Sequence, residues 1–204
     1  MAKGIIIDEN VNRRKMISLN FELYLDVILE PVSGYDGAIA YLQKYPNLPI
    51  IVCQNNIAND YTVLKTFAFI KSNKLDIPIV CVGECPKLDS EKNVTIVTDV
   101  ANDLKKAIAW AAKKLSITAE MMAFMDTDEY YPISTHHFYL ISSAPCDIFY
   151  LTIDKQPIIQ IPKGSAISRE MINNWLIDKK TVLHVNKYER LKFVNHLTQD
   201  AISI

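Results

Sequence analysis

The sequence predicts an α/β fold in which a doubly wound, five-stranded parallel sheet is followed by a second, smaller α+β domain. Within about the first 115 of the 204 residues, five short apolar runs alternate with segments of helical periodicity. The connections between these runs are long enough to cross over and return, so parallel pairing is expected. After residue 117 the pattern changes to aromatic and β-branched runs with hairpin spacing, which predicts a separate domain.

The third apolar run, Leu48 to Cys53, is expected to be the central strand of the first domain. It contains two Ile and a Val and stops at a polar loop, and Asp60 beyond that loop is suited to capping the next helix. In open α/β sheets the carboxyl ends of the strands carry the chemistry. The residue at the tip of this strand, Cys53, is therefore the first candidate functional residue.

The other elements of the first domain follow from the same criteria. Strands are predicted at residues 4–7, 27–32, 77–83 and 94–97. Helices are predicted at about 11–25 with Asn10 as a cap, at a segment that ends before Pro46, at a segment that begins near residue 60, and at about 102–115. The last helix has apolar residues at i, i+3, i+4, i+7, i+8 and i+11 from Leu104 and is the strongest amphipathic pattern in the chain. The segment Glu84 to Lys92 is polar and interrupted by Pro86, so no long helix is expected there.

The first domain is expected to span residues 1–117, and residues 118–129 are interpreted as a linker. This linker combines a short Met-rich helix at 120–125 with an acidic stretch at 126–129. The second domain, 130–204, is expected to have strands at 130–141, 148–153, 157–161 and 182–185, with a turn around Asp154 and Lys155. Ser168 or the residues just before it can cap one helix, and a final helix is expected from about Tyr188.

Composition and charge restrict the class of protein. Half of the residues are hydrophobic, yet no run reaches the length of a membrane span, and the start of the chain moves directly into strand residues rather than a signal-peptide core. We therefore expect a cytoplasmic protein without membrane insertion. The formal net charge of −1 is spread along the chain, so nucleic acid is not an expected partner. The four cysteines lack paired spacing and are expected to be buried thiols in a reducing compartment rather than zinc ligands.

Several segments of the first domain together resemble a response-regulator receiver domain. Ile5-Ile6-Ile7-Asp8-Glu9 resembles the first strand and acidic pair of that family, and Cys53 followed seven residues later by Asp60 resembles the third strand, the phosphoacceptor position and the loop after it. The run 77–83 resembles the fourth strand, and 94–104 resembles the fifth strand and the start of the last helix. This resemblance covers more than half of the chain and implies the strand order 2-1-3-4-5.

The resemblance also implies that the receiver chemistry is lost. Receivers use a carboxylate to attack a phosphoryl group, an acidic pair to hold Mg²⁺, and a hydroxyl and a lysine to bind the product. Here the acidic pair, Asp8 and Glu9, remains. The other positions fall on Cys53, or Gln54 in an alignment shifted by one, on Gly83 for the hydroxyl, and on Thr98 or Asp99 for the lysine. The chain therefore resembles a degenerate receiver that cannot take phosphate from a histidine kinase.

Two alternatives concern the same residues. Asp8 and Glu9 have no third carboxylate nearby in the sequence, so Mg²⁺ would be held weakly, and a structural or vestigial role is expected. A reactive Cys53 would make the protein a redox sensor, but two neighbouring carboxylates raise the pKa of a thiol and disfavour the thiolate.

The second domain resembles the small α/β segment that precedes HD-GYP cyclic-di-GMP phosphodiesterase domains in many bacterial proteins. The resemblance lies in Tyr130-Tyr131-Pro132-Ile133, in residues 146–151 and in residues 182–188. No His-Asp dipeptide or Gly-Tyr-Pro triplet occurs, so the metal ligands of such a hydrolase are absent from this sequence, which ends about where that domain would begin. The alternative function is therefore the regulatory front part of such a phosphodiesterase, or a remnant that binds a cyclic dinucleotide through Lys155, Lys163 and Arg169.

Other motifs give no catalytic hypothesis. His136 and His137 fall in a predicted strand, where adjacent side chains point to opposite faces and cannot bind one ion. With five glycines the chain has no glycine-rich phosphate loop, and no nucleophile elbow occurs. The aromatic residues at 138, 139, 149 and 150 lack interleaved positive charge and are expected to form core and sheet contacts rather than a base-stacking surface.

The leading hypothesis is a non-enzymatic bacterial signalling protein without a cofactor, acting through protein contacts of its receiver-like domain. By resemblance to receivers, the expected partner face includes segment 84–92 and the outer side of helix 104–115. A homodimer through that last helix is one form such a contact can take.

Overall fold

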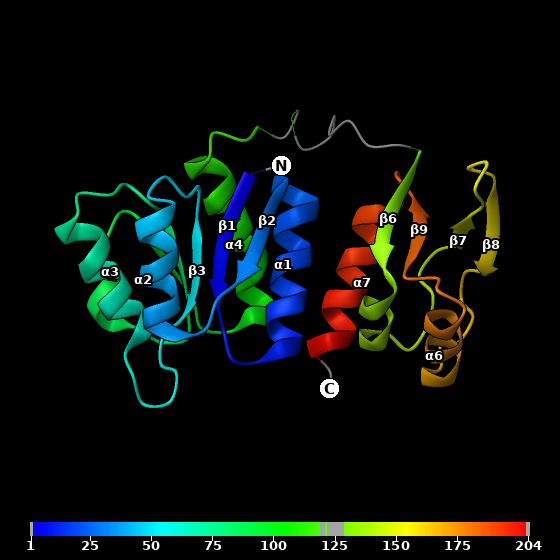
Figure 1. Ribbon diagram of the computed structural model, residues 1–204, viewed down its shortest axis with the longest axis horizontal. Coiled ribbons are helices and arrows are strands. Elements are labelled where there is room, and N and C mark those ends of the chain that lie inside the picture. Colours follow the sequence, from blue (N-terminus) through cyan, green and yellow to red (C-terminus); the bar gives the residue numbers. More distant parts are fainter. Residues whose placement is uncertain (1, 119–120, 122–128, 203–204) are drawn as a thin grey trace. The chain divides into compact units, whose positions relative to one another are not determined.

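The computed structural model describes residues 2–118, 121 and 129–202. The chain divides into two compact units, Met1–Met125 and Asp126–Ile204, each with its own sheet (Figure 1). Most of the linker expected at 118–129, including its Met-rich helix and its acidic residues 126–128, lies outside the described residues.

The first unit contains a five-stranded, fully parallel sheet. Its strands are β1 (Ala2–Ile7), β2 (Val27–Pro31), β3 (Ile51–Gln54), β4 (Ile79–Val82) and β5 (Val94–Val97), in the order β2-β1-β3-β4-β5. The predicted parallel sheet and its strand order are thus confirmed. The strands are nearly continuous apolar runs because helices cover both of their faces.

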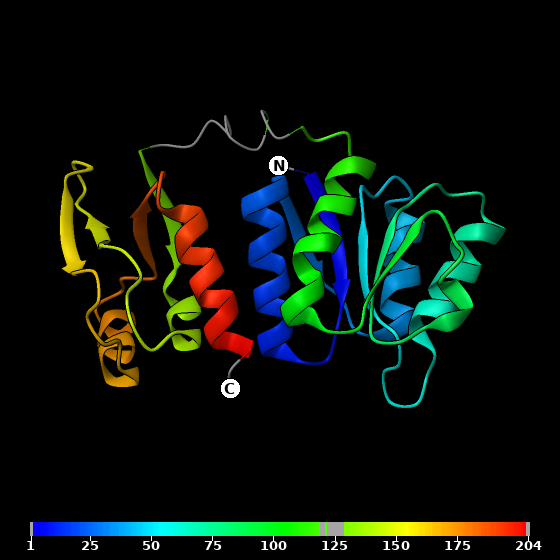
Figure 2. The same cartoon turned by 180° about the vertical axis from the view of Figure 1, so that it is seen from behind.

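Two helices lie on each face of this sheet (Figures 1 and 2). α1 (Val11–Leu25) and α4 (Val100–Lys114) pack on one face, and α2 (Gly34–Lys44) and α3 (Thr62–Ser72) pack on the other. The predicted apolar stripe of the last helix is buried from Leu104 to Ala112. Between β4 and β5 the chain forms only a 3₁₀ turn, η1 (Pro86–Leu88), so the prediction of no long helix in segment 84–92 is confirmed.

The helix starts agree only in part with the predicted caps. The side chain of Asn10 accepts a hydrogen bond from the Arg13 amide at 2.9 Å and caps α1 as predicted. The predicted cap at Asp60 is wrong. Residues 57–60 form a tight turn with two left-handed residues, which leaves Asp60 two positions before α3, and its carboxylate instead pairs with Lys65 at 2.6 Å.

Gly4 allows the close approach of two central strands. A Cβ atom at this position would lie 2.6 Å from the carbonyl oxygen of Ile50 and 3.0 Å from the side chain of Leu29. Only a residue without a side chain fits between these neighbours.

The second unit contains a four-stranded antiparallel sheet and is α+β, as predicted. Its strands are β6 (Tyr130–Ser134), β7 (Ile148–Leu151), β8 (Pro157–Ile161) and β9 (Val182–Asn186), in the order β6-β9-β7-β8. The helices are α6 (Arg169–Ile177) and α7 (Arg190–Ile202). The hydroxyl of Ser168 caps α6 by accepting a hydrogen bond from the Met171 amide at 3.2 Å, as predicted.

One long predicted strand is wrong in its second half. The segment expected as strand 130–141 leaves the sheet after Ser134 and forms a 3₁₀ helix, η2 (Thr135–Leu140). This turn places the ring of Phe138 against Trp175 and Phe193, with centroid distances of 6.1 and 5.5 Å. Burial of this aromatic cluster outweighs the β-propensity of the segment. His136 and His137 therefore lie on η2 and not on a strand.

Among the described residues, no helix combines the length and the apolar character that crossing a membrane requires.

Candidate functional site

The candidate site of the first unit lies at the carboxyl ends of β1, β3, β4 and β5. In the parallel register Ile7 pairs with Cys53 and Gln54 pairs with Val82. The residues that follow Ile7, namely Asp8 and Glu9, therefore come beside the end of β3. The sheet thus brings the acidic pair and one of the two predicted acceptor positions together.

Asp8 is engaged by an arginine from the first turn of α1. Its side chain is fully buried, and it accepts hydrogen bonds from Arg13 Nε at 2.6 Å and Arg13 Nη2 at 2.9 Å, one to each carboxylate oxygen. The amide of Asn10 donates to Oδ1 at 2.8 Å, and Arg14 donates to the Asp8 carbonyl oxygen at 2.7 Å. Such a two-pronged guanidinium contact is a strong form of ion pair, and it occupies both oxygens of the carboxylate.

Glu9 is exposed, and its nearest polar partner is Gln54. The Gln54 side-chain oxygen accepts from the Glu9 amide at 3.2 Å, and its Nε2 donates to Glu9 Oε1 at 3.5 Å and to the Asn56 carbonyl oxygen at 2.9 Å. The Gln54 side-chain amide therefore connects the end of β1 to the loop after β3 by hydrogen bonds. The side chain at the end of β3 is therefore a neutral amide.

Cys53 does not occupy the tip of β3, contrary to the expectation from the sequence. The strand ends at Gln54, and the Cys53 side chain is 0% exposed among core residues that pack toward α2 and α3. Burial, and then the nearby Cys81 and Asp8, raise the pKa of the Cys53 thiol well above its ordinary value. The thiol is therefore protonated at neutral pH, which disfavours a redox role.

Gly83 follows β4 in a backbone conformation that side chains rarely adopt. Its φ is +105°, and its amide donates to the Val97 carbonyl oxygen at 2.8 Å. The neighbouring Asn55 donates through its backbone to Val82 at 2.8 Å and through Nδ2 to the Glu84 carbonyl oxygen. A hydroxyl-bearing side chain at position 83 would strain this turn.

Thr98 and Asp99 immediately precede α4. Asp103 Oδ2 accepts from the Thr98 hydroxyl and from the Asp99 amide, both at 3.2 Å, and Lys106 donates to Oδ1 of Asp103 at 3.1 Å. The Asp99 amide and Lys106 lower the pKa of Asp103. The two residues at the predicted lysine position therefore support a helix start, and neither is a cation.

The donor set at this edge does not fit a Mg²⁺ ion. The described residues contain no group of three His, Cys, Asp or Glu side chains that is placed to hold a metal. Both oxygens of Asp8 already accept from Arg13, and Glu9 has no cationic partner among the residues that the structure describes. A hard divalent cation prefers several oxygen ligands and would compete with the guanidinium for the same atoms.

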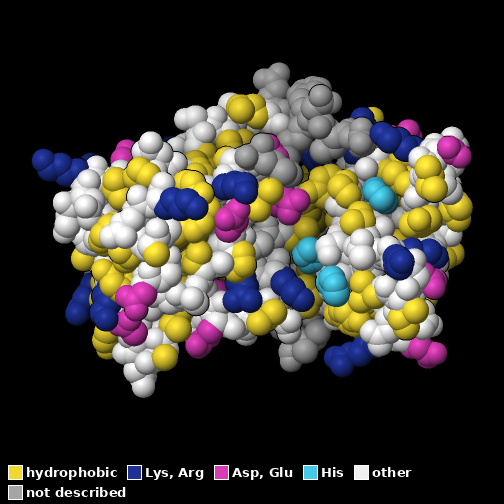
Figure 3. Space-filling view, in the orientation of Figure 1, with side chains coloured by type: hydrophobic (Ala, Val, Ile, Leu, Met, Phe, Trp, Pro, Cys, Tyr) yellow, Lys and Arg dark blue, Asp and Glu magenta, His cyan; other side chains and the backbone are white. Residues whose placement is uncertain are grey.

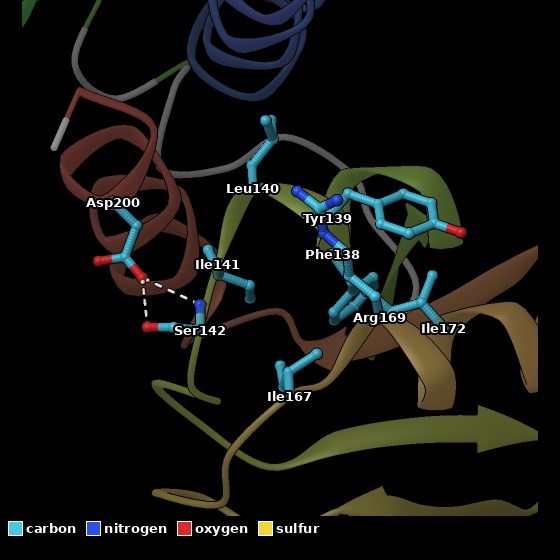
Figure 4. A pocket seen from close by; sticks show the side chains of 9 residues that line it. All are labelled: Phe138, Tyr139, Leu140, Ile141, Ser142, Ile167, Arg169, Ile172 and Asp200. Atoms are coloured by element: carbon cyan, nitrogen blue, oxygen red, sulfur yellow. Dashed lines mark hydrogen bonds between the residues drawn. The ribbon is translucent and has the colours of Figure 1, made fainter. Parts of the chain in front are cut away.

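The three residues predicted to contact phosphate in the second unit do not converge. Lys155 lies in the β7–β8 turn and Lys163 follows the far end of β8, so a strand that spans about 16 Å separates them. Arg169 is the first residue of α6 and lines a pocket of about 340 Å³ (Figure 4). The other lining residues are Phe138, Tyr139, Leu140, Ile141, Ser142, Ile167, Ile172 and Asp200. The carboxylate of Asp200 disfavours a phosphate in this pocket.

Sequence reasoning missed a polar cluster beside this pocket. Asp200 Oδ2 accepts from the amide and hydroxyl of Ser142 at 3.2 and 3.3 Å (Figure 4). The same oxygen lies 3.6 Å from His196 Nε2, and the Ser143 hydroxyl lies 3.4 Å from that nitrogen. A catalytic triad requires the acid and the serine on different ring nitrogens, so this arrangement links α7 to the loop after η2 without triad geometry. The i, i+4 spacing of His196 and Asp200 on a predicted helix was the one signal for it.

No family model matches this chain, and no curated protein matches it at a significant level.

Proposed function

We propose that this chain is a non-catalytic, cytoplasmic signalling protein of bacterial type, in which a receiver-like unit unable to accept a phosphoryl group acts through protein contacts. The single observation that carries the proposal is the buried ion pair between Asp8 and Arg13. It supports the proposal because the Arg13 guanidinium occupies both oxygens of the buried carboxylate of the acidic pair, which a divalent cation would need as ligands.

The neighbouring positions support the same proposal. Gln54 is a neutral amide, which is a poorer nucleophile than a carboxylate. Gly83 has a φ of +105°, a backbone conformation that disfavours a residue with a hydroxyl side chain. Transfer of a phosphoryl group requires an attacking oxygen and neutralisation of the transferring oxygens. Neither group is supplied by these side chains, so the unit is proposed to signal by binding.

The outer face of α4 is the proposed contact surface. Lys105, Lys106, Lys113 and Lys114 are exposed there, and within the described part of the chain Asp103 pairs with Lys106 and with none of the other three. A symmetric dimer centred on this face would bring like charges together, whereas a partner with an acidic surface would be attracted. We therefore favour an acidic protein partner over a homodimer through this helix.

The test is affinity capture from the native cells with the full-length chain as bait. Lys105→Glu combined with Lys113→Glu reverses charge on the outer face of α4 without touching its buried stripe. The matched control is Lys44→Glu, which changes an exposed lysine at the end of α2. A partner that the wild type and the control retain and the double variant loses is the expected result. Equal capture of that partner by all three chains would contradict the assignment of this face.

The alternative, a cyclic-dinucleotide-binding remnant of a phosphodiesterase, has no such observation in its favour. Its three basic residues lie at the two ends of β8 and at the start of α6. Arg169, which lines a pocket, shares that pocket with the carboxylate of Asp200. Calorimetric titration with cyclic di-GMP distinguishes the two functions, and the adaptor function predicts no heat of binding.

A further inference from the structure

β8 is an edge strand of the antiparallel sheet. In the order β6-β9-β7-β8 it pairs with β7 on one side, and no described residue pairs with it on the other. Its five residues, Pro157-Ile158-Ile159-Gln160-Ile161, include no charged side chain. Proteins protect edge strands with charges, prolines or bulges, and β8 has a proline at its start and a register shift opposite Ile148 but no charge on the strand itself.

The hydrogen bonds of the hairpin show which backbone groups face the open edge. Thr152 donates to the Gln156 carbonyl oxygen at 3.0 Å, so the backbone groups of Gln156 point toward β7. Alternate residues repeat this direction in an antiparallel pair, so Ile158 also faces β7 while Pro157 and Ile159 face outward. Ile159 thus offers both an N–H and a C=O to a new strand, and Pro157 offers a C=O.

The side chains at this edge are apolar and accessible on both faces of the sheet. Ile158 is 52% exposed and Ile159 is 53% exposed, and Ile153 at the adjoining turn is 100% exposed. Neighbouring residues of a strand point to opposite faces, so the edge presents an isoleucine above and below the sheet. Figure 3 shows hydrophobic side chains gathered over the strands of this unit.

Three lysines and two aspartates lie around β8. Lys155 and Lys163 are exposed at its two ends, and Lys180 donates to the Gln160 side-chain oxygen at 3.0 Å. The nearby acids are Asp154 and Asp147, and one oxygen of Asp147 already accepts from the Lys163 amide. A strand laid along this edge would therefore meet a lysine at each end.

The same lysines disfavour a second copy of the chain at this edge. A two-fold antiparallel pairing that uses both backbone groups of Ile159 places each Ile159 opposite the other. Lys155 lies in the turn before β8 and Lys163 lies after its end, so such a pairing would bring Lys155 of one copy toward Lys163 of the other at both ends of the paired strands. Like charges brought together in this way disfavour the pairing.

We propose that the edge of β8 binds an extended peptide segment of another protein as an added strand, and that this segment is apolar with an acidic residue at each end. Backbone hydrogen bonds at Ile159 would hold the segment, Ile158 and Ile159 would contact its side chains, and Lys155 and Lys163 would pair with its acids. This site lies in the second unit and does not rest on the proposed function of the first.

The test uses the full-length chain and two blocked, fluorescently labelled peptides. The first probe is Glu-Thr-Ile-Thr-Val-Thr-Ile-Thr-Glu, in which the acids are spaced as Lys155 and Lys163 are. The second probe has lysine in place of both glutamates. Fluorescence anisotropy is expected to show binding of the first peptide about tenfold tighter than of the second. That preference should shrink as salt concentration rises.

Two variants separate the charge contribution from the backbone contribution. Lys155→Glu combined with Lys163→Glu should reverse the preference in favour of the lysine-flanked peptide. Ile159→Pro removes the outward N–H and should reduce binding of both peptides, while Ile177→Thr changes an isoleucine of α6 that is 75% exposed and should leave binding unchanged. Circular dichroism of each variant verifies that the fold is retained.

Three results would overturn the proposal. Absence of binding to the first peptide would refute the site, and equal affinity for both peptides in the wild type would refute its preference for acidic ends. Concentration-dependent dimers of the wild type that Ile159→Pro abolishes in sedimentation would assign the edge to a second copy. None of these results depends on the charges of α4, so failure here is distinguishable from failure of the proposed function.

Discussion

The two sheets of this protein differ in how completely their surfaces and polar groups are used. In the parallel sheet, β1 lies between helices with Ile5, Ile6 and Ile7 fully buried, and the charge of Asp8 at its end is satisfied by Arg13. In the antiparallel sheet, β8 leaves Ile159 half exposed, and no described strand pairs with its outward backbone groups. The comparison indicates that the charged group at the end of β1 is already satisfied within the first unit, whereas the edge of β8 in the second unit leaves a surface that another strand can contact.

The largest expected loss of stability comes from removing the ion-pair partner of Asp8 in the first unit. Arg13→Met would leave the fully buried carboxylate of Asp8 without its counter-charge and should lower the free energy of unfolding by about 3 kcal/mol. Urea denaturation measures this loss. The matched control is Arg14→Met, which removes one hydrogen bond to the Asp8 carbonyl oxygen and should cost about 1 kcal/mol. Equal losses for the two variants would show that the buried charge pair has no special role.

The next effect concerns the packing of the buried parallel sheet. Gly4→Ala forces a Cβ atom to within 2.6 Å of the Ile50 carbonyl oxygen and should destabilise the protein by about 1–3 kcal/mol. Gly37→Ala in α2 places its Cβ at an ordinary 3.4 Å from its nearest neighbour and should be neutral or stabilising by about 0.5 kcal/mol. Thermal unfolding of both variants checks the contrast. A neutral Gly4→Ala would mean that β1 and the Ile50 backbone at the start of β3 are not as close as described.

A smaller effect of opposite sign is expected at the β7–β8 turn. Lys155 has a φ of +57°, a left-handed conformation that glycine adopts without strain, so Lys155→Gly should stabilise the protein by about 1 kcal/mol. Lys163→Gly lacks this benefit because Lys163 is not left-handed, and it should be neutral or destabilising. Chemical denaturation of the two variants separates relief of backbone strain from loss of a lysine charge.

The smallest expected effect is a pH dependence of stability that arises from His184 in the antiparallel sheet. His184 is partly buried with Nδ1 lacking a hydrogen-bond partner among the described residues, and burial lowers its pKa below 6.5. The unfolded chain then binds the proton more readily, so stability is fully present above pH 6.5 and falls as the pH drops below it. His184→Phe should reduce this loss, measured as the change in Tm between neutral and mildly acidic buffer. The exposed His136→Phe should retain it, and an unchanged pH profile in His184→Phe would contradict the assignment.

The fold was predictable because its strands are short, apolar and regularly spaced. Apolar runs such as Ile5–Ile7 and Val94–Val97 indicate buried strands of a parallel sheet, and the apolar residues from Leu104 to Ala112 recur with helical spacing. The second half of the predicted strand 130–141 failed for a tertiary reason. Phe138 packs against Trp175 and Phe193, which are remote in sequence, so local β-propensity was overridden.

The candidate site was predictable in its place but not in its contacts. The acidic pair was found from the end of β1, but choosing between Cys53 and Gln54 required the register, because a shift of one residue moves a side chain to the other face of the sheet. The Arg13 contact depends on how the cap at Asn10 turns α1 over Asp8, a geometry that residue spacing does not specify. The open edge of β8 required the strand order of the second sheet, which its hairpin spacing alone did not determine.

The measurement that tests the account most directly is the intact mass of the protein after incubation with acetyl phosphate and Mg²⁺. The account predicts no added mass, because Asp8 is held by Arg13 and Gln54 is no nucleophile. A receiver domain with an intact acceptor aspartate serves as the positive control in the same buffer. A stable phosphoryl adduct on Asp8, Glu9 or Asp60 would contradict the central claim that the first unit acts by contact and not by phosphorylation.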